Sequence, residues 1–435
     1  MDLSGQQIAI LGAGRSGRAA AELACRLGGA VTVYDSGSEK VFEGISEAIK
    51  AHAGANAETG ASVRADLVVV SPGIETKGEF VQGFAKGAGE VIGEIELASR
   101  VYKGKVVGIT GTNGKTTTTE LIQQVLEAGG MSCVCAGNYG VPFAEVVMQE
   151  EPPEVVALEL SSFQLETISR FRPDVAVWLN FSPDHMDRYE SIEEYFAAKL
   201  RIFENQTASD DAVVRFGEDL GSLAARCVTF SSAEDLADYV LRDRCISKGE
   251  AVVLDLSMTK LRGLHNAENA MAALAVGEIM GVSAEDAVSA LSECSPPAHR
   301  CELIGTRGGV EYINDSKATN LHALESALKS QAGDAILIAG GKEKGLDYSP
   351  VLPLVSERVR HAILIGEIRD SLGQLLAGVV ANEMADTLEE AVQMAAAEAT
   401  EGETVLFSPG TSSFDMFSGY EERGEVFRNA VQQLQ

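Results

Sequence analysis

Residues 106 to 119 hold side chains suited to phosphate chemistry. An apolar run beginning at Val106 ends in a loop that reads Gly111, Thr112, Asn113, Gly114, Lys115, Thr116 and Thr117. In such a loop small residues let backbone N–H groups face a polyphosphate, the lysine reaches the terminal phosphates and the next threonine can bind Mg²⁺. The usual first glycine is replaced by Ile109, and a plain glycine-rich turn is the alternative, but the order of glycine, lysine and threonine favours a nucleoside triphosphate site.

Two further polar positions follow apolar, strand-like runs. Glu159 lies within the run 155–160, and His185 follows the run 175–180 with acidic residues on both sides. A carboxylate in a buried strand is costly unless it is paired or bound to a metal. Because parallel sheets bind ligands at the carboxyl ends of their strands, we predict Glu159 as a Mg²⁺ ligand and His185 as a metal or phosphate ligand. The alternative for Glu159 is a helix cap.

A third pattern lies near the N-terminus. Glycines 12, 14 and 17 follow the strand-like run 8–11, and Asp35 ends a second run, 30–34. This order is the Rossmann fingerprint for a bound nucleotide, which we favour over a mere tight turn. NAD is the usual ligand, but a UDP group would use the same diphosphate cradle, and no later residue suggests hydride chemistry.

The elements that must position these residues alternate between strands and helices, which predicts an α/β protein with mainly parallel sheets. We expect three domains: a Rossmann-like domain over 1–94, a central P-loop ATPase-like domain over 95–297 and a second Rossmann-like domain over 298–435. Short β-like runs between residues 210 and 255 predict a small accessory sheet. Ser295 to Pro297 reads as a linker, and Ser191 with Glu194 reads as a capping box that opens a helix.

Composition limits the class of protein. The chain has 435 residues, 45% of them apolar, and a net charge of −29, which argues against nucleic-acid and anionic-membrane partners. No apolar run approaches the ~18 residues of a membrane span, so we expect no membrane insertion. No signal peptide is recognisable, and seven scattered cysteines fit reduced thiols, so we expect a cytoplasmic protein.

The phosphate loop resembles that of a known family. Thr-Gly-Thr-Asn-Gly-Lys-Thr is similar to the ATP loop of the Mur ligases, the ATP-dependent amide-bond-forming enzymes of peptidoglycan synthesis, and of their folylpolyglutamate synthetase relatives. The segments 161–166 and 313–320 resemble the branch of the family that adds D-glutamate to UDP-N-acetylmuramoyl-L-alanine. The resemblance covers the whole chain in order.

The resemblance implies a chemistry and a set of catalytic residues. ATP would phosphorylate the alanine carboxylate, and the D-glutamate amine would then attack the acyl phosphate, with two Mg²⁺ ions bound. Lys199 alone would be a surface lysine, but the matching family lysine is carbamylated by CO₂ and becomes an anionic metal ligand. The implied catalytic residues are Lys115, His185, Lys199 and Lys317. The implied metal ligands are Thr116, Glu159, His185 and Lys199 as its carbamate.

The resemblance also assigns binding residues. Beyond the phosphate loop, the implied ATP contacts are Asn266, Asn269, Arg300 with its neighbour His299, and Asp315. The implied substrate contacts are Arg15, Ser16, Gly17, Asp35, Ser36 and Gly73 for UDP, Asn138 near the γ-phosphate, and Lys317, Thr319, Lys344, Ser413, Phe414 and Tyr420 in the C-terminal domain. The expected partners are small molecules only, and we expect a monomer.

Two other functions fit parts of the sequence. A sister ligase that adds L-alanine or a diamino acid would share the phosphate loop, although the segments 161–166 and 313–320 argue against it. A nucleotide-gated binding or switch protein would also combine a Rossmann domain with a phosphate loop, although the C-terminal lysines and serines favour the enzyme.

Overall fold

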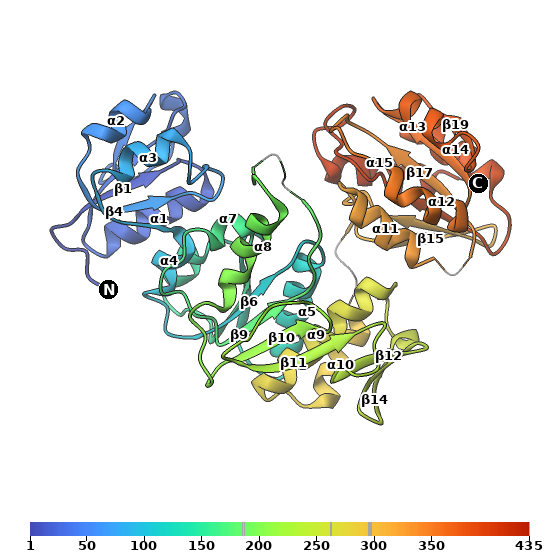
Figure 1. Ribbon diagram of the computed structural model, residues 1–435, viewed down its shortest axis with the longest axis horizontal. Helices are drawn as coiled ribbons and strands as arrows, with labels where there is room; N and C mark the ends of the chain where they lie inside the picture. Colours follow the sequence, from blue (N-terminus) through green and yellow to red (C-terminus); the bar gives the residue numbers. More distant parts are fainter. Residues whose placement is uncertain (185, 187, 262, 295–297, 332, 435) are drawn as a thin grey trace. The chain divides into compact units, whose positions relative to one another are not determined.

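The computed structural model describes residues 1–184, 186, 188–261, 263–294, 298–331 and 333–434. These residues form three β-sheets, each accompanied by α-helices (Figure 1). They divide into two compact units: residues 1–242 with 246–254 and 269–291, and residues 243–245 with 255–268 and 292–435. The linker expected at residues 295–297 lies outside the described residues. The three domain boundaries therefore stay a proposal.

The first sheet has the order β3-β2-β1-β4-β5, and neighbouring strands pair in parallel. Its strands are β1 (Gln7–Leu11), β2 (Ala30–Tyr34), β3 (Lys50–His52), β4 (Ala65–Val70) and β5 (Ala88–Gly93). Its helices are α1 (Arg15–Arg26), α2 (Ala57–Ser62) and α3 (Glu79–Ala85). Apolar residues of β1 and β4 are buried on both faces, as expected for a central parallel strand covered by helices.

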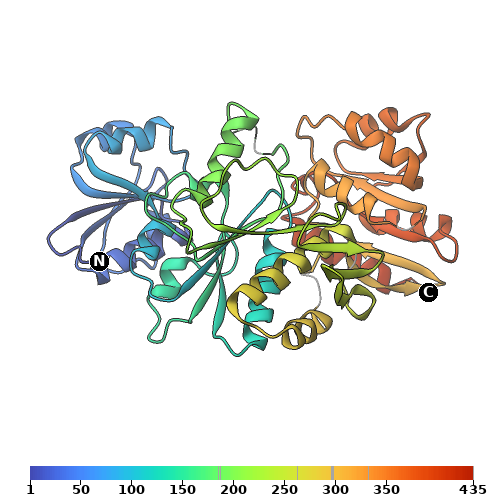
Figure 2. The same cartoon turned by 60° about the horizontal axis from the view of Figure 1, so that its bottom comes forward.

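The second sheet has nine strands in the order β14-β13-β12-β11-β10-β9-β6-β8-β7. The strands are β6 (Lys105–Thr110), β7 (Cys133–Gly137), β8 (Val155–Glu159), β9 (Val175–Trp178), β10 (Asp211–Arg215), β11 (Arg226–Ser231), β12 (Tyr239–Arg242), β13 (Cys245–Lys248) and β14 (Ala251–Asp255). The helices are α4 (Glu94–Ser99), α5 (Lys115–Ala128), α6 (Phe143–Val147), α7 (Ser162–Leu165), α8 (Ile192–Leu200), α9 (Leu264–Met280) and α10 (Ala284–Glu293). Figure 2 shows this sheet in a second orientation.

Two local predictions need correction in this sheet. The strands between residues 210 and 255 do not form a separate accessory sheet, because β10 pairs in parallel with β9 and buries Ala212 to Val214 as a continuation of the central core. The capping box before α8 is half formed. Ser191 accepts the Glu194 N–H, whereas the Glu194 carboxylate binds Lys77 and the Glu190 N–H.

The third sheet has the order β15-β16-β20-β17-β18-β19. Its strands are β15 (Glu302–Arg307), β16 (Val310–Asn314), β17 (Ala335–Gly340), β18 (Val359–Ile365), β19 (Ala381–Met384) and β20 (Thr404–Phe407). Its helices are α11 (Leu321–Lys329), α12 (Leu352–Arg358), α13 (Arg369–Leu376), α14 (Leu388–Glu398) and α15 (Tyr420–Gln432). Among the described residues of this sheet, only β15 departs from the expected parallel pairing, because the two-residue turn Gly308-Gly309 is too short for a parallel crossover.

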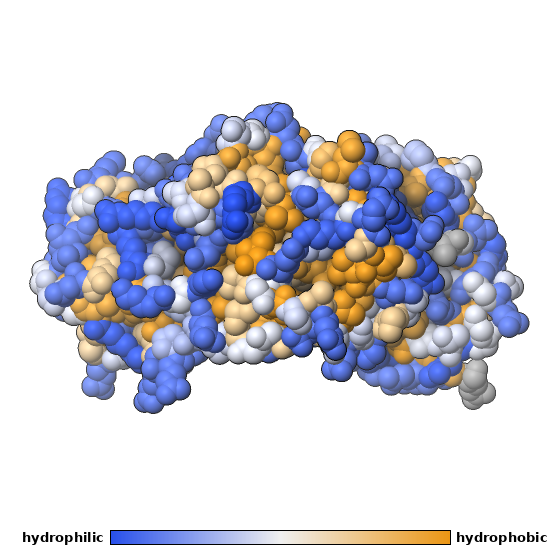
Figure 3. Space-filling view, turned by 90° about the horizontal axis from the view of Figure 1, so that it is seen from below, coloured by the Kyte–Doolittle hydropathy of each residue, from blue (hydrophilic) through white to orange (hydrophobic). Residues whose placement is uncertain are grey.

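The mainly parallel α/β fold predicted from the alternating pattern is confirmed. No helix among the residues that the structure describes is long and apolar enough to cross a membrane. On the face seen in Figure 3, hydrophilic residues surround smaller apolar patches.

Candidate active site

The loop between β6 and α5 has the geometry of a phosphate loop. Gly111 and Gly114 have φ values of +151° and +83°, which favour glycine, and a Cβ at Gly114 would lie 2.5 Å from the Asn269 Oδ1. The 14-residue helix α5 begins at Lys115, so its N-terminal N–H groups follow the loop directly. Lys115 Nζ donates to the carbonyls of Gly111 (3.0 Å) and Thr112 (2.9 Å) and so curls back over the loop.

Asn180, just beyond β9, braces this loop. Its side chain accepts the Asn113 N–H at 2.9 Å and donates to the Asn113 carbonyl at 3.1 Å. Next to it, the Thr112 hydroxyl bonds both the carbonyl and the N–H of Ser182, each at 3.1 Å. We assigned no role to Asn180 from the sequence. A polar residue ending the apolar run 175–180 is the signal that could have pointed to it.

Glu159 ends β8 in the interior, only 2% exposed. Its Oε1 accepts a hydrogen bond from the Asn138 side chain at 2.7 Å, whereas Oε2 is buried with no hydrogen-bond partner among the described atoms. The capping alternative does not hold, because Ser161 and Gln164 form the capping box of α7. A buried carboxylate oxygen left unpaired beside a phosphate loop fits a cation ligand.

Lys199 is not a surface lysine. It lies on α8, is 2% exposed, and its Nζ donates to the Gly111 carbonyl at 2.8 Å, so Lys115 and Lys199 share that acceptor. Burial, and then the charge of Lys115, hold the pKa of Lys199 well below its ordinary value. The Tyr195 ring centroid lies 4.9 Å from the Lys199 Nζ. Both lysines therefore converge at the phosphate loop.

The described residues alone do not complete a metal site. They contain no group of three or more His, Cys, Asp and Glu side chains placed to hold a metal ion. His185 lies outside the described residues. The predicted metal ligands therefore include Thr116, at the start of α5, and a carbamate at Lys199. Neither of these is a His, Cys, Asp or Glu side chain.

The first sheet carries a cavity of about 900 Å³ at the carboxyl ends of β1, β2 and β4. Five of the six residues predicted to hold UDP line it: Arg15, Ser16, Asp35, Ser36 and Gly73. The Asp35 carboxylate accepts the N–H groups of Ala13 and Gly37, each at 2.8 Å, and so fixes the glycine-rich turn. This position is the one where doubly wound sheets bind nucleotides.

Gly17, the sixth, does not line the cavity. It is buried in α1, where an added Cβ would lie 1.9 Å from the Gly12 carbonyl oxygen. We expect Gly17→Ala to lower the free energy of unfolding by about 1–3 kcal/mol, because the backbone must move to relieve this contact. Gly14→Ala is the matched control, since its Cβ would meet nothing within 4 Å. Equal urea midpoints for the two variants would contradict the packing role.

The third sheet gathers the predicted C-terminal residues after β16, β17 and β20. Asp315 is buried. Its oxygens accept from the Ser408 hydroxyl (2.8 Å) and the Cys301 N–H (3.2 Å), and burial raises its pKa to about 7. Lys317 Nζ lies 3.5 Å from the Tyr420 ring centroid, a cation–π contact.

Lys344 lines a cavity of about 570 Å³ after β17, and its Nζ lies 3.5 Å from the Thr319 carbonyl. Ser413 is buried, and Phe414 is 66% exposed. Arg423, which the sequence analysis missed, is buried and donates to the Thr411 carbonyl (3.1 Å) and to Ser316. Burial lowers its pKa to about 10. No spacing pattern marks Arg423 in the sequence.

The remaining predicted ATP contacts lie on α9 and near β15. Asn266 and Asn269 are buried on α9, and the Asn269 Oδ1 accepts the Thr118 hydroxyl at 3.1 Å. Arg300 is half-buried, and His299 is buried with its Nδ1 3.1 Å from the Asn314 amide nitrogen. Asn269 is thus placed against α5, whereas adenine binding stays a prediction.

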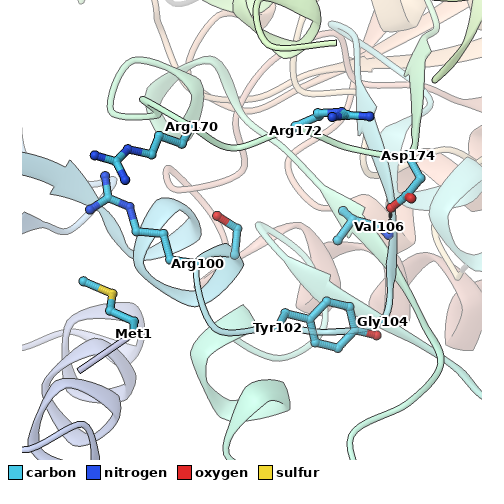
Figure 4. Close-up of a pocket in the computed structure, with 9 residues that line it drawn as sticks. Met1, Arg100, Tyr102, Gly104, Val106, Arg170, Arg172 and Asp174 are labelled. Carbon is cyan, nitrogen blue, oxygen red and sulfur yellow. Dashed lines mark hydrogen bonds between the residues drawn. The ribbon is translucent and has the colours of Figure 1, made fainter. Parts of the chain in front are cut away.

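A further cavity of about 550 Å³ lies at the amino ends of β6 and β9 (Figure 4). Arg100, Arg170 and Arg172 line it. Arg100 is bonded to Glu90 and Glu96, and Arg172 to Asp210. Because ligands of parallel sheets bind at the carboxyl ends, we do not include this cavity in the candidate site.

Comparison with known proteins gives a family for all three sheets. Residues 6–93 match the model of the Mur ligase MurD-like N-terminal domain, residues 109–277 that of the Mur ligase middle domain, and residues 299–410 that of the Mur ligase glutamate ligase domain. The UDP-N-acetylmuramoylalanine--D-glutamate ligase of Geobacter metallireducens is 43% identical over 456 residues, covering 100% of this chain and 99% of that protein. The enzyme of the same name from Chlorobium limicola is 39% identical, with 99% of each chain covered.

Solved structures agree on the fold. A pseudomurein peptide ligase type C from Methanothermus fervidus has a TM-score of 0.60 at 17% identity, covering 99% of this chain and 100% of that chain. The MurF ligase from Thermotoga maritima, in complex with ADP, has a TM-score of 0.60 at 17% identity, covering 86% of this chain and 97% of that chain. With matches to all three family models and full-length relatives near 40% identity, this chain belongs to the Mur ligase family.

Proposed function

We propose that this protein is an ATP-dependent ligase that adds D-glutamate to UDP-N-acetylmuramoyl-L-alanine in the synthesis of peptidoglycan precursors. The observation that carries the proposal is the convergence of Lys115 and Lys199 on the Gly111 carbonyl. Its setting, at the carboxyl ends of β6, β8 and β9 in a chain 43% identical to a named D-glutamate ligase, supports the assignment of substrate.

The first chemical step is phosphorylation of the alanine carboxylate, which is otherwise a poor electrophile. Catalysis of phosphoryl transfer consists mostly of positioning and charge stabilisation. In this chain the N–H groups at the start of α5 would hold the phosphates, and Lys115 would offset negative charge on the transferring group. Asn180 keeps the loop in shape through its two bonds to Asn113.

Mg²⁺ fits this site because the Glu159 Oε2 is buried and has no hydrogen-bond partner within the described part of the chain. When bound, Mg²⁺ would supply positive charge that stabilises the triphosphate and the developing charge on its oxygens. The residues we assign to hold two such ions are Thr116, Glu159, Lys199 as its carbamate, and His185, which lies outside the described residues. Asn138 would orient the Glu159 carboxylate through their 2.7 Å hydrogen bond.

In the second step the D-glutamate amine attacks the acyl phosphate, and inorganic phosphate leaves. We assign the two carboxylates of D-glutamate to Lys344, Thr319 and Ser413, with Lys317 close to the reacting group. The cavity that Lys344 lines supports this assignment. In a protein of net charge −29, the Lys344 ammonium supplies a local positive charge that an anionic substrate needs. We further propose that the enzyme acts as a cytoplasmic monomer on small-molecule substrates.

Lys344→Ala should raise the KM for D-glutamate about 10- to 100-fold and leave the KM for ATP nearly unchanged. The reason is that it removes one charged ground-state contact to a single substrate, worth about 1.5–3 kcal/mol. Steady-state kinetics with each substrate varied in turn would measure this, with Lys329→Ala, on the exposed face of α11, as control. Equal increases in both KM values would assign Lys344 to structure rather than to substrate binding.

Phosphate release tests the proposed function as a whole. Release should require ATP, UDP-N-acetylmuramoyl-L-alanine and D-glutamate together, and L-glutamate should not replace D-glutamate. Activity with L-alanine or a diamino acid instead would indicate a sister ligase. Nucleotide turnover that needs no amino acid would indicate a switch protein.

A further inference from the structure

Arg188 connects two loops that belong to different sheets of the first unit. It lies between β9 and α8, and its guanidinium donates to the carbonyls of Pro72 (3.3 Å) and Ile74 (3.0 Å), in the loop after β4. Pro72 and Ile74 both line the 900 Å³ cavity of the first sheet. The side chain of Arg188 is only 15% exposed, so its bonds are shielded from water. Arg188 therefore ties the β9–α8 loop to the wall of that cavity.

Two neighbours hold the guanidinium in place. The Phe163 ring centroid lies 3.9 Å from its central carbon, and the Glu166 Oε2 lies 3.6 Å from its Nη2. Glu166 also accepts the hydroxyls of Thr76 and Tyr189, each at 2.6 Å. A planar guanidinium can lay its face on a ring while a fixed fork of donors points outward in its plane, a geometry that a lysine ammonium lacks. The contacts at this position are therefore suited to arginine rather than to lysine.

The same β9–α8 loop also contacts the phosphate loop. Ser182 lies near its start and exchanges two hydrogen bonds with the Thr112 hydroxyl. Arg188, which binds the cavity wall, and Ser182, which binds the phosphate loop, therefore belong to one loop and are six residues apart in the sequence. Two anchors on one short loop are a physical means by which two sites can be coupled.

We propose that Arg188 is a positioning residue that couples ligand binding in the 900 Å³ cavity to the phosphate loop. A ligand that orders the loop after β4 orders the two carbonyls that Arg188 binds, and through Arg188 the loop that contacts Thr112. The inference rests on the proposed function for the identity of the two ligands, a UDP-sugar and ATP. It assigns a role to Arg188 that is independent of the amino acid added.

Calorimetric titration measures the coupling directly. The Kd for UDP-N-acetylmuramoyl-L-alanine is measured alone and with saturating Mg²⁺ and a non-hydrolysable ATP analogue. In the wild-type protein we expect the second ligand to tighten binding by about 5-fold or more, the lower end of common allosteric couplings. In Arg188→Gln the factor should fall close to one, while the Kd of the ATP analogue alone stays within about 2-fold of wild type.

Two variants separate coupling from structure. Arg26→Gln is the matched control, because Arg26 also donates from the first sheet's α1 to a carbonyl near the second sheet, that of Met148 at 3.0 Å, but lines neither site. It should retain the full coupling factor. Arg188→Lys keeps the charge but not the fork of donors, so it should show a reduced factor even if Arg188→Gln proves unstable.

The outcomes are distinguishable. A coupling factor unchanged in both Arg188 variants, or a factor of one in the wild-type protein, would overturn the inference and leave the proposed function intact. Equal losses of affinity for both ligands, together with a lowered Tm, would assign Arg188 to folding alone and also overturn it. A wild-type protein that binds no UDP-sugar would instead contradict the proposed function.

Discussion

Lys115→Ala is expected to lower kcat/KM by about 10³-fold or more, the usual result of removing a group that stabilises charge in phosphoryl transfer. Lys115 is the first residue of α5, and its ammonium lies over the loop through bonds to Gly111 and Thr112. A phosphate would compete for the same ammonium. The charge therefore belongs to the reaction more than to the fold. Phosphate release at varied ATP concentration measures the loss.

Lys105→Ala is a suitable control for this experiment. Lys105 is exposed at the amino end of β6, the strand whose other end leads into the phosphate loop. Its removal should change neither kcat/KM nor Tm appreciably, since surface substitutions are usually within about 0.5 kcal/mol of neutral. A purified Lys115→Ala variant with near-wild-type turnover and an unchanged Tm would show that the loop does not act on the triphosphate.

Local patterns were sufficient to predict the parallel sheets and the ends of their strands. Runs such as 8–11 and 155–158 are apolar on both faces, and in an α/β protein this pattern fits few structures other than a buried parallel strand. Glu159 was predicted at a strand end, whereas Asn138 was assigned only through the resemblance, and the order β6-β8-β7 brings the two into contact. Sequence periodicity thus places residues at an edge, and the strand order decides which of them meet.

Residues that act through backbone groups of distant segments could not be predicted. Asn180, Arg188 and Arg423 all bond mainly to peptide carbonyls and N–H groups, which any sequence supplies. The side chain of the residue that offers the backbone group therefore gives no sign of the contact in the sequence. The pairing of β10 with β9 was missed for a similar reason, because ladder hydrogen bonds join backbones and leave little trace in residue type.

The environment of Lys199 in the structure differs most from the one that its sequence pattern predicts. By pattern alone it is an ordinary helix lysine, yet it is buried at the phosphate loop with a lowered pKa. A protonated ammonium at this place would be repelled by Lys115 and by any cation bound at Glu159. A neutral amine escapes that repulsion and can react with CO₂, which adds to nitrogen with release of one proton. The resulting carbamate is an anion suited to a metal ligand.

Lys199→Ala is therefore expected to lose most activity, about 10²-fold or more in kcat, because it removes one charged group from the reacting centre. Formate or acetate should restore part of that loss by taking the place of the carbamate oxygens, and neither should raise the activity of Lys115→Ala, whose missing group is a cation. Carbon-13 spectra of the wild-type protein in labelled bicarbonate should show a carbamate signal that Lys199→Ala lacks. An electron-density map of active, bicarbonate-exposed enzyme with a bare Lys199 amine would rule the carbamate out, and the buried lysine would then have to act as a cation held by the Gly111 carbonyl.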